Sequence, residues 1–190
     1  MTATATASTV SAPPLPAPGR WAIDPGHAQV GFLGRHFQLT KIRGRFRDVS
    51  GVITVADDPL DSEVAVTIGM ASVESGNATR DEHLRSADLF DVERFPTATF
   101  RGRLAAWSGT RGQLVGALTL RDVTRQIALD VTYHGAVRDP WGAERIVFSA
   151  SAPINREDWG VTWNMVLDAG GLLVSKDIQL EIEVEAIRED

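Results

Sequence analysis

Apolar and polar residues alternate along most of the chain from Gly19 onward. A period of two places the apolar side chains of a strand on one face. The clearest case is 178–186, where five aliphatic residues alternate with one glutamine and three glutamates. The same alternation recurs around Val30 and Phe32, around Ile42 and Phe46, and over 64–70, 98–106, 114–120, 127–133 and 146–150. The pattern predicts seven or eight short strands, each apolar on one face.

Turn-forming residues separate these strands, as at Asp57-Asp58-Pro59, Ser108-Gly109, Asp139-Pro140 and Gly170-Gly171. Strands that alternate with long helices would indicate a parallel sheet, and that pattern is absent. An antiparallel barrel or a sandwich remains. The barrel is favoured, because strands as long as 174–186 would otherwise leave open edges to protect. We therefore predict an all-β, extended antiparallel barrel of eight strands.

Two segments interrupt the alternation. Residues 79–90 are predicted to form a short helix, with Thr79 as its N-cap and Glu82 three residues later completing a capping box. Residues 155–160 are predicted to form a turn or a single helical turn before the last hairpin.

Residues 1–18 contain no charged and no aromatic side chain and consist mainly of Thr, Ala, Ser and Pro. Such a segment cannot bury enough surface to offset its ordering entropy, so we predict a disordered tail followed by one domain over 19–190. The tail has neither the basic start nor the continuous apolar segment of a secretory signal, and no apolar run approaches the roughly 20 residues of a membrane span. We expect a cytoplasmic location.

The composition excludes several kinds of site. The 190 residues include no cysteine, which excludes disulfides, thiolate zinc sites, iron–sulfur clusters and a cysteine nucleophile. A net charge of −6 speaks against a nucleic-acid partner. No GxSxG elbow or P-loop is present, and we expect no catalytic residue, no cofactor and no metal site. The histidines show no spacing typical of metal ligands; they are His27, His36, His83 and His134.

Several motifs are more specific than the alternation. The domain opens on Trp21-x-Ile23-Asp24-Pro25-x-His27, residues 80–86 read RDEHLRS, 88–96 read DLFDVERFP, and 154–160 read INREDWG. No generic barrel requires these residues. The series resembles the YceI-like family of bacterial proteins, from about Trp21 to Ala186. Two positions depart from the family pattern: Ala28 stands where Ser is usual, and Asp122 where Gly is expected.

The resemblance implies an extended lipocalin-like barrel whose lumen holds a long isoprenoid chain, such as a polyprenyl phosphate or a quinone, and it allows a homodimer. The function we expect is the binding and carriage or storage of a polyisoprenoid or similar long-chain amphiphilic lipid, without catalysis. Two alternatives are an enzyme of isoprenoid or lipid modification, using His36 with Arg80 or Asp81, and a structural or interaction module whose barrel is filled by its own side chains.

Small residues at inward positions would leave room for a ligand. They are Gly44, Gly102, Gly116, Ala98, Ala106 and Ala150. Bulky inward residues, with residues near the barrel mouth, are the candidate ligand-binding set. They are Phe32, His36, Phe46, Ile68, Leu84, Phe90, Phe100, Leu118, Leu129, Phe148, Trp163 and Leu180.

Charged residues near the predicted mouth have two interpretations. Arg80, Asp81 and Arg85 are expected to pin the helix across one end of the barrel through ion pairs and cap hydrogen bonds, with Leu84, Ala87, Phe90 and Phe95 as its apolar side. A basic stripe of Lys41, Arg43, Arg45 and Arg47 alternates with small or apolar residues, so its four charges share one face. This stripe is either the solvated outer face, beside Glu181, Glu183 and Glu185, or a surface for an anionic membrane or a phosphate head group. Trp159 and Trp163 are core, mouth or tunnel aromatics.

Overall fold

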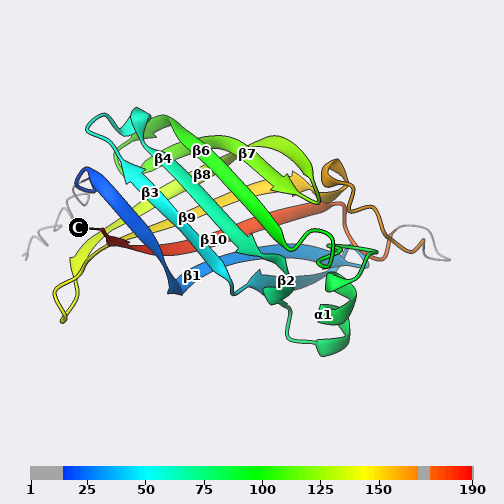
Figure 1. Cartoon of the computed structure of the whole chain (residues 1–190). Helices are drawn as coiled ribbons and strands as arrows, with labels where there is room; N and C mark the ends of the chain where they lie inside the picture. The colour runs from blue at the N-terminus through cyan, green and yellow to red at the C-terminus, as the bar shows by residue number, and fades with distance from the viewer. Residues whose placement is uncertain (1–14, 167–171, 190) are drawn as a thin grey trace, which may run out of the picture.

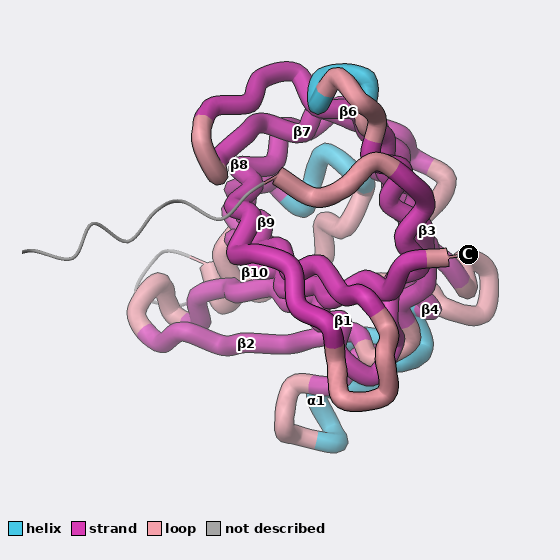
Figure 2. Tube along the Cα trace, turned by 90° about the vertical axis from the view of Figure 1, so that its left-hand side faces the viewer, coloured by secondary structure: helices cyan, strands magenta, loops and turns pink. Residues whose placement is uncertain are grey.

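The computed structural model describes residues 15–166 and 172–189, and most of the predicted tail (1–14) lies outside this part of the chain (Figure 1). Eight strands form a closed ring in which every neighbouring pair is antiparallel (Figure 2). In order around the ring they are β1 (Gly19–His36), β3 (Val49–Val55), β4 (Glu63–Gly69), β6 (Thr97–Ser108), β7 (Arg111–Leu120), β8 (Val123–Arg138), β9 (Glu144–Asn155) and β10 (Asp177–Arg188). Pairing of β10 with β1 closes the ring. The predicted eight-stranded antiparallel barrel is confirmed.

Two further strands extend the sheet at one end. The first residues of β1 pair with β3, whereas Val30–His36 pair with β2 (Thr40–Phe46), which pairs in turn with β5 (Val73–Glu74). A bulge over residues 24–27 separates the two parts of β1, because four residues there stand opposite the single Glu185 of β10. Bulges bend a strand, and this one lets β1 serve two partners in succession.

The one α-helix of the described residues is shorter than predicted and begins at another cap. Helix α1 spans Ala78–Arg85, and the Asn77 side chain accepts a hydrogen bond from the Arg80 backbone N–H at 3.0 Å. The predicted cap Thr79 therefore lies inside the first turn, so the capping box with Glu82 is wrong. Asn and Thr both cap helices, and the chain uses the earlier residue. Across the described residues, no helix has the length and apolar character of a membrane span.

In the part of the chain that the structure describes, there are also three short 3-10 helices: η1 (Pro59–Asp61), η2 (Met70–Ser72) and η3 (Arg156–Trp159). The Asn155 side chain caps η3, and Gly160 ends it in the left-handed conformation. This confirms the short helical turn predicted over 155–160.

The core consists of three clusters of buried side chains inside the barrel. Near the start of β1, Trp21, Tyr133, Ile146 and Ala186 pack together, each at most 2% exposed. A second cluster around Phe46 and Met70 includes side chains from α1 and the segment after it, and a third lies around Phe100 and Leu129. The barrel is therefore filled by its own side chains in the region around Trp21, but not throughout its interior.

Candidate functional site

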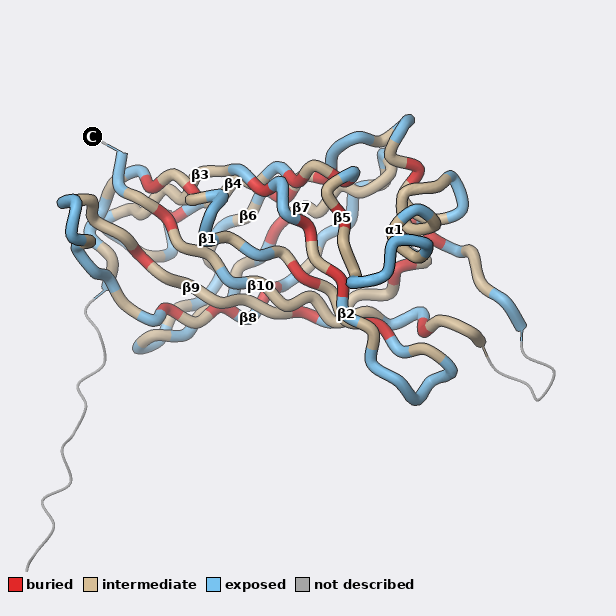
Figure 3. Tube along the Cα trace, turned by 90° about the horizontal axis from the view of Figure 1, so that it is seen from below, coloured by how far each residue is buried: buried red, intermediate tan, exposed pale blue. Residues whose placement is uncertain are grey.

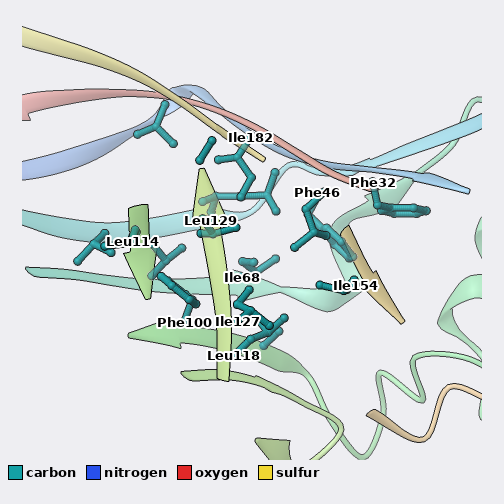
Figure 4. Close-up of a pocket in the computed structure, with 18 of the residues that line it drawn as sticks. Phe32, Phe46, Ile68, Phe100, Leu114, Leu118, Ile127, Leu129, Ile154 and Ile182 are labelled. Carbon is teal, nitrogen blue, oxygen red and sulfur yellow. The ribbon is translucent and has the colours of Figure 1, made fainter. Parts of the chain in front are cut away.

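An apolar cavity of about 670 Å³ runs inside the barrel (Figure 4). All eight ring strands contribute side chains to its wall, and α1 and the segments around Trp163 and Leu173 contribute at one end. On β10 the lining residues are every second one from Ile178 to Val184. Because a strand rises about 3.3 Å per residue, this stretch is about 20 Å long. The volume falls within the roughly 300–1,000 Å³ usual for ligand sites.

All twelve predicted site residues line this cavity. The set comprises Phe32, His36, Phe46, Ile68, Leu84, Phe90, Phe100, Leu118, Leu129, Phe148, Trp163 and Leu180. That these residues contact a ligand stays a prediction. The set omitted inward residues that the same alternation could have identified, among them Val64, Val66, Leu114, Ile127 and Ile182.

One predicted inward residue points outward. The pairing of β6 with β7 shifts after Leu104, and beyond this irregularity Ala106 is exposed while Trp107 lines the cavity. A shift of one residue moves each following side chain to the other face of the sheet. The prediction for Ala106 is wrong for this reason.

The inward glycines act differently from the expectation that they simply leave empty space. A Cβ atom on Gly44 would lie 2.3 Å from the ring of Phe32. On Gly102 and Gly116 it would lie 2.8 Å and 2.7 Å from the ring of Phe100. The rings therefore occupy the space next to these glycines. Each glycine lets an aromatic ring rest against the wall, which keeps that ring from projecting further into the lumen.

The two ends of the cavity carry opposite charges. At the end formed by α1, η3 and the end of β1, the lining includes Arg35, His36, Arg80, His83 and Arg156. At the other end, beside residues 15–18, it includes Asp57 and Glu63. The first end is called the basic mouth below. An amphiphile with electron-rich oxygen atoms at its polar end is complementary to this mouth.

Arg156 is the most buried charge at the basic mouth, at 7% exposure. Its guanidinium donates to three backbone carbonyls: those of Ser175 at 3.0 Å, Val161 at 2.5 Å and Trp163 at 3.0 Å. Among the described residues no carboxylate forms an ion pair with it, and burial lowers its pKa. A guanidinium has five N–H donors, so these three bonds leave donors for a further acceptor.

The helix α1 is held beside the mouth by hydrogen bonds rather than by the expected ion pairs. Arg80 donates to the hydroxyl and the carbonyl of Ser75, at 2.7 Å each, and Asp81 accepts from the Ser75 N–H at 2.8 Å. Arg85 donates to the carbonyls of Ala71 and Val73.

The apolar side of this segment differs from the prediction at Ala87 and at Phe95. Leu84 and Phe90 line the cavity as expected, together with Leu89. Ala87, predicted on the same side, is exposed, because the helix ends at Arg85 and the helical spacing does not continue to it. Phe95 lies beneath the guanidinium groups of Arg94 and Arg121.

The two tryptophans near η3 have separate places. Trp159 is 2% exposed and donates its indole N–H to the Leu118 carbonyl at 3.0 Å, so it is a core residue. Trp163 lines the cavity and meets the His83 ring edge-on, with the ring centroids 4.3 Å apart.

One cluster of possible metal ligands escaped the sequence reasoning. Ligand atoms of Asp24, His27 and Glu185 lie within 4.8 Å of one another. The guanidinium of Arg145 occupies this cluster, 2.6 Å from Asp24, 2.9 Å from Asp139 and 3.4 Å from Glu185. Arg145, with help from His27, lowers the pKa of Asp24 to about 2. The arginine supplies the positive charge that a cation would bring. Spacing could not reveal the cluster, since Glu185 joins Asp24 and His27 only through the pairing of β10 with β1.

The basic stripe lies on β2 and the residue after it, Arg47, and faces outward. Arg43 pairs with Glu181 at 3.3 Å, as the outer-face interpretation expects. Arg45 and Arg47 pair instead with Glu74 of β5, which lowers the pKa of Glu74. Lys41 is exposed next to the β1–β2 turn.

Comparison with known proteins agrees with this geometry. The family model described as "YceI-like domain" matches residues 21–186. A Serratia proteamaculans relative, named "UPF0312 protein", is 37% identical over 163 residues, which cover 85% of this chain and 82% of the relative. The crystal structure of the Campylobacter jejuni YceI protein has a TM-score of 0.70 at 33% identity, covering 82% of this chain and 90% of that one.

A more distant structure shares the fold. The Saccharophagus degradans domain described as a polyisoprenoid binding domain has a TM-score of 0.67 at 16% identity, covering 89% of this chain and 98% of that one. The match of sequence over most of the chain and the shared barrel lead to one conclusion: this chain belongs to the YceI-like domain family.

Proposed function

We propose that the barrel binds a polyisoprenoid or a similar long-chain amphiphilic lipid, with the chain along the lumen and the polar end at the basic mouth. The observation that carries this proposal is the apolar cavity itself, which all eight ring strands line and which ends in a cluster of basic side chains. The distant structural neighbour described as polyisoprenoid-binding supports the same ligand class.

The energetics suit carriage or storage. Each buried methylene group contributes roughly 0.8 kcal/mol, so a long chain has a large gross gain in the cavity. Ordering of the chain and its competing association with other lipids offset much of this gain. The remainder favours tight, slowly exchanging binding that depends mainly on the chain.

The surroundings of the residues named for catalysis favour binding over an enzyme. Catalysis needs polar groups that converge on one reacting position. Arg80 and Asp81 are instead engaged with Ser75, where they hold α1 in place. His36 lines the mouth with its ring against Phe37, the ring centroids 3.9 Å apart. Its position suits a hydrogen bond to the polar end of a ligand.

The test is mass spectrometry of an organic extract of the purified protein, before and after incubation. We expect a co-purifying long-chain lipid in near-stoichiometric amount that incubation leaves unchanged. A clean extract from a protein that also takes up no added polyprenol would refute the proposal. Conversion of the lipid during incubation would favour the enzyme instead.

A matched pair of variants separates the lumen from the outer surface. Ala150→Trp adds an indole to the cavity wall, whereas Val115→Trp adds the same group at an exposed position on β7. We expect the first variant to lose bound lipid and the second to retain it, with both folded by circular dichroism. Equal lipid content in the two proteins would show that the lipid binds elsewhere.

A further inference from the structure

Exposed apolar side chains gather beside the basic mouth. Phe37 and Leu39 lie in the β1–β2 turn, 47% and 78% exposed, and Figure 3 draws this turn as the pale-blue loop beside β2. Met165 and Val166 are 55% and 79% exposed. Backbone hydrogen bonds join the two segments through Leu173, whose carbonyl accepts from Phe37 and whose N–H donates to Met165, at 2.9 Å each. These four residues are called the apolar tip below.

The β1–β2 turn holds its apolar side chains outward at a conformational cost. Phe37 and Gln38 both have positive φ, 54° and 61°, and the Leu39 N–H bonds to the His36 carbonyl at 3.0 Å. This is the geometry of a type I′ turn, which strongly prefers Asn-Gly. A bulky residue with positive φ is uncommon and persists where the surroundings or the function require it.

The basic side chains nearest the apolar tip have no carboxylate partner among the described residues. Residues 28–47 contain five basic and no acidic residues. Arg43, Arg45 and Arg47 pair with Glu181 and Glu74 of neighbouring strands, which leaves Lys41 and Arg35 outside these ion pairs. Lys41 is adjacent to the tip, and Arg35 lines the cavity. Basic residues next to an apolar protrusion are complementary to an anionic bilayer, where they approach the head groups while the apolar side chains enter the interface.

We propose that the apolar tip docks the basic mouth on an anionic membrane surface, so that a lipid passes between bilayer and lumen with little exposure to water. This inference rests on the proposed function, because it concerns the route of the lipid. Its second support is continuity with the cavity: the Phe37 ring packs at a tilt against the ring of His36, which lines the mouth. A lipid that leaves the bilayer at the tip therefore enters directly at the cavity opening.

The opposite end of the barrel provides an internal control. Trp141 in the β8–β9 hairpin is 89% exposed, more than any residue of the tip. Its surroundings are balanced in charge, since Arg138 pairs with Glu144 and Arg145 with Asp139. Exposure alone would favour docking through Trp141. Exposure together with charge and the cavity mouth favours the apolar tip.

The experiment is flotation of the full chain with vesicles of equimolar phosphatidylcholine and phosphatidylglycerol, compared with phosphatidylcholine alone. We expect binding to the anionic vesicles that weakens with salt. The double variant Leu39→Ser, Met165→Ser should bind the vesicles at least about tenfold more weakly. Burying one large aliphatic side chain strengthens binding by about tenfold or more. Lys41→Glu should weaken binding by about tenfold as well. Trp141→Ser should bind like the wild type.

The proposal fails if the wild type does not float, if the tip variants float like the wild type, or if Trp141→Ser abolishes binding. It also fails if the wild type is a dimer by analytical ultracentrifugation that the double variant dissociates, since the tip would then face a second copy. Lipid content measured on the same variants keeps the two proposals apart. If the tip variants lose flotation but yield as much extracted lipid as the wild type, the docking proposal is supported. If the wild type floats but carries no lipid, the lumen-binding proposal is refuted and the docking of the tip is not.

Discussion

Arg145 is the best place to test the electrostatics of this barrel. Its side chain is 16% exposed and contacts three carboxylates, those of Asp24, Asp139 and Glu185. Substitution Arg145→Met keeps much of the aliphatic stem but leaves these carboxylates facing one another without a cation. Removing one partner from a half-buried ionic cluster is costly, because the remaining charges keep their desolvation penalty.

The pKa of Asp24 gives the size of the effect. It lies at about 2 instead of 3.8, first because of the hydrogen bond from Arg145 and next because of His27. One pKa unit corresponds to about 1.4 kcal/mol, so the ionised Asp24 contributes up to about 2 kcal/mol to stability at neutral pH. The pKa of Asp139 is lowered by the same arginine. We therefore expect Arg145→Met to lower the free energy of unfolding by about 2 kcal/mol or more.

The sign of the pH dependence follows from the lowered pKa. The unfolded chain binds the proton near pH 4 and the folded chain only near pH 2, so this stabilisation is complete above about pH 4 and is lost as the pH falls toward 2. Urea unfolding at neutral pH and near pH 3 measures this. The free energies of unfolding of the wild type and Arg145→Met should differ less at the lower pH.

A matched control is available in the same hairpin. Arg138 is 68% exposed and pairs with Glu144, so Arg138→Met should cost no more than about 1 kcal/mol. A loss for Arg145→Met no larger than for Arg138→Met, or a gap that does not narrow in acid, would refute the electrostatic reasoning.

Two further predictions concern the barrel wall and the helix. Gly116→Ala should destabilise the fold by at least about 1–3 kcal/mol in thermal or urea unfolding, because the new methyl group would lie 2.3 Å from a backbone carbonyl. Gly44→Ala should cost less, since only the Phe32 ring must turn away, and equal losses would contradict this. Asn77→Ala should cost about 1 kcal/mol by removing the helix cap, whereas Thr79→Ala should leave stability nearly unchanged. A larger loss of stability for Thr79→Ala than for Asn77→Ala would show that Thr79 caps the helix, as the sequence predicted.

The cavity wall was largely predictable because strand periodicity is local. A side chain two residues along a strand returns to the same face whatever the partner strands are, so Leu180 and Ile182 could be assigned inward without the fold. The assignment failed at Ala106, where a bulge changes the phase of the alternation. Bulges depend on how two strands pair, and the pattern of one strand does not record them.

The helix shows the same limit at its start. Asn77 and Thr79 are both competent caps, and propensity ranks them closely. The choice depends on where the chain leaves β5, on the hydrogen bond that Arg80 donates to Ser75, and on the one that Asp81 accepts from Ser75. Those contacts fix the position of the first turn, so the tertiary structure selects the cap.

The sequence by itself determined the strands, their inward faces and the family, because each depends on residues close together in the chain. The tertiary structure decided that packed side chains fill the barrel around Trp21 and which end of the cavity is basic. It also decided that the side chains of Asp24 and Arg145, 121 positions apart in the sequence, form an ion pair. Closing a barrel brings strands from both ends of the chain into contact. The net charge at each opening comes from several loops, and these loops lie side by side only in the closed barrel.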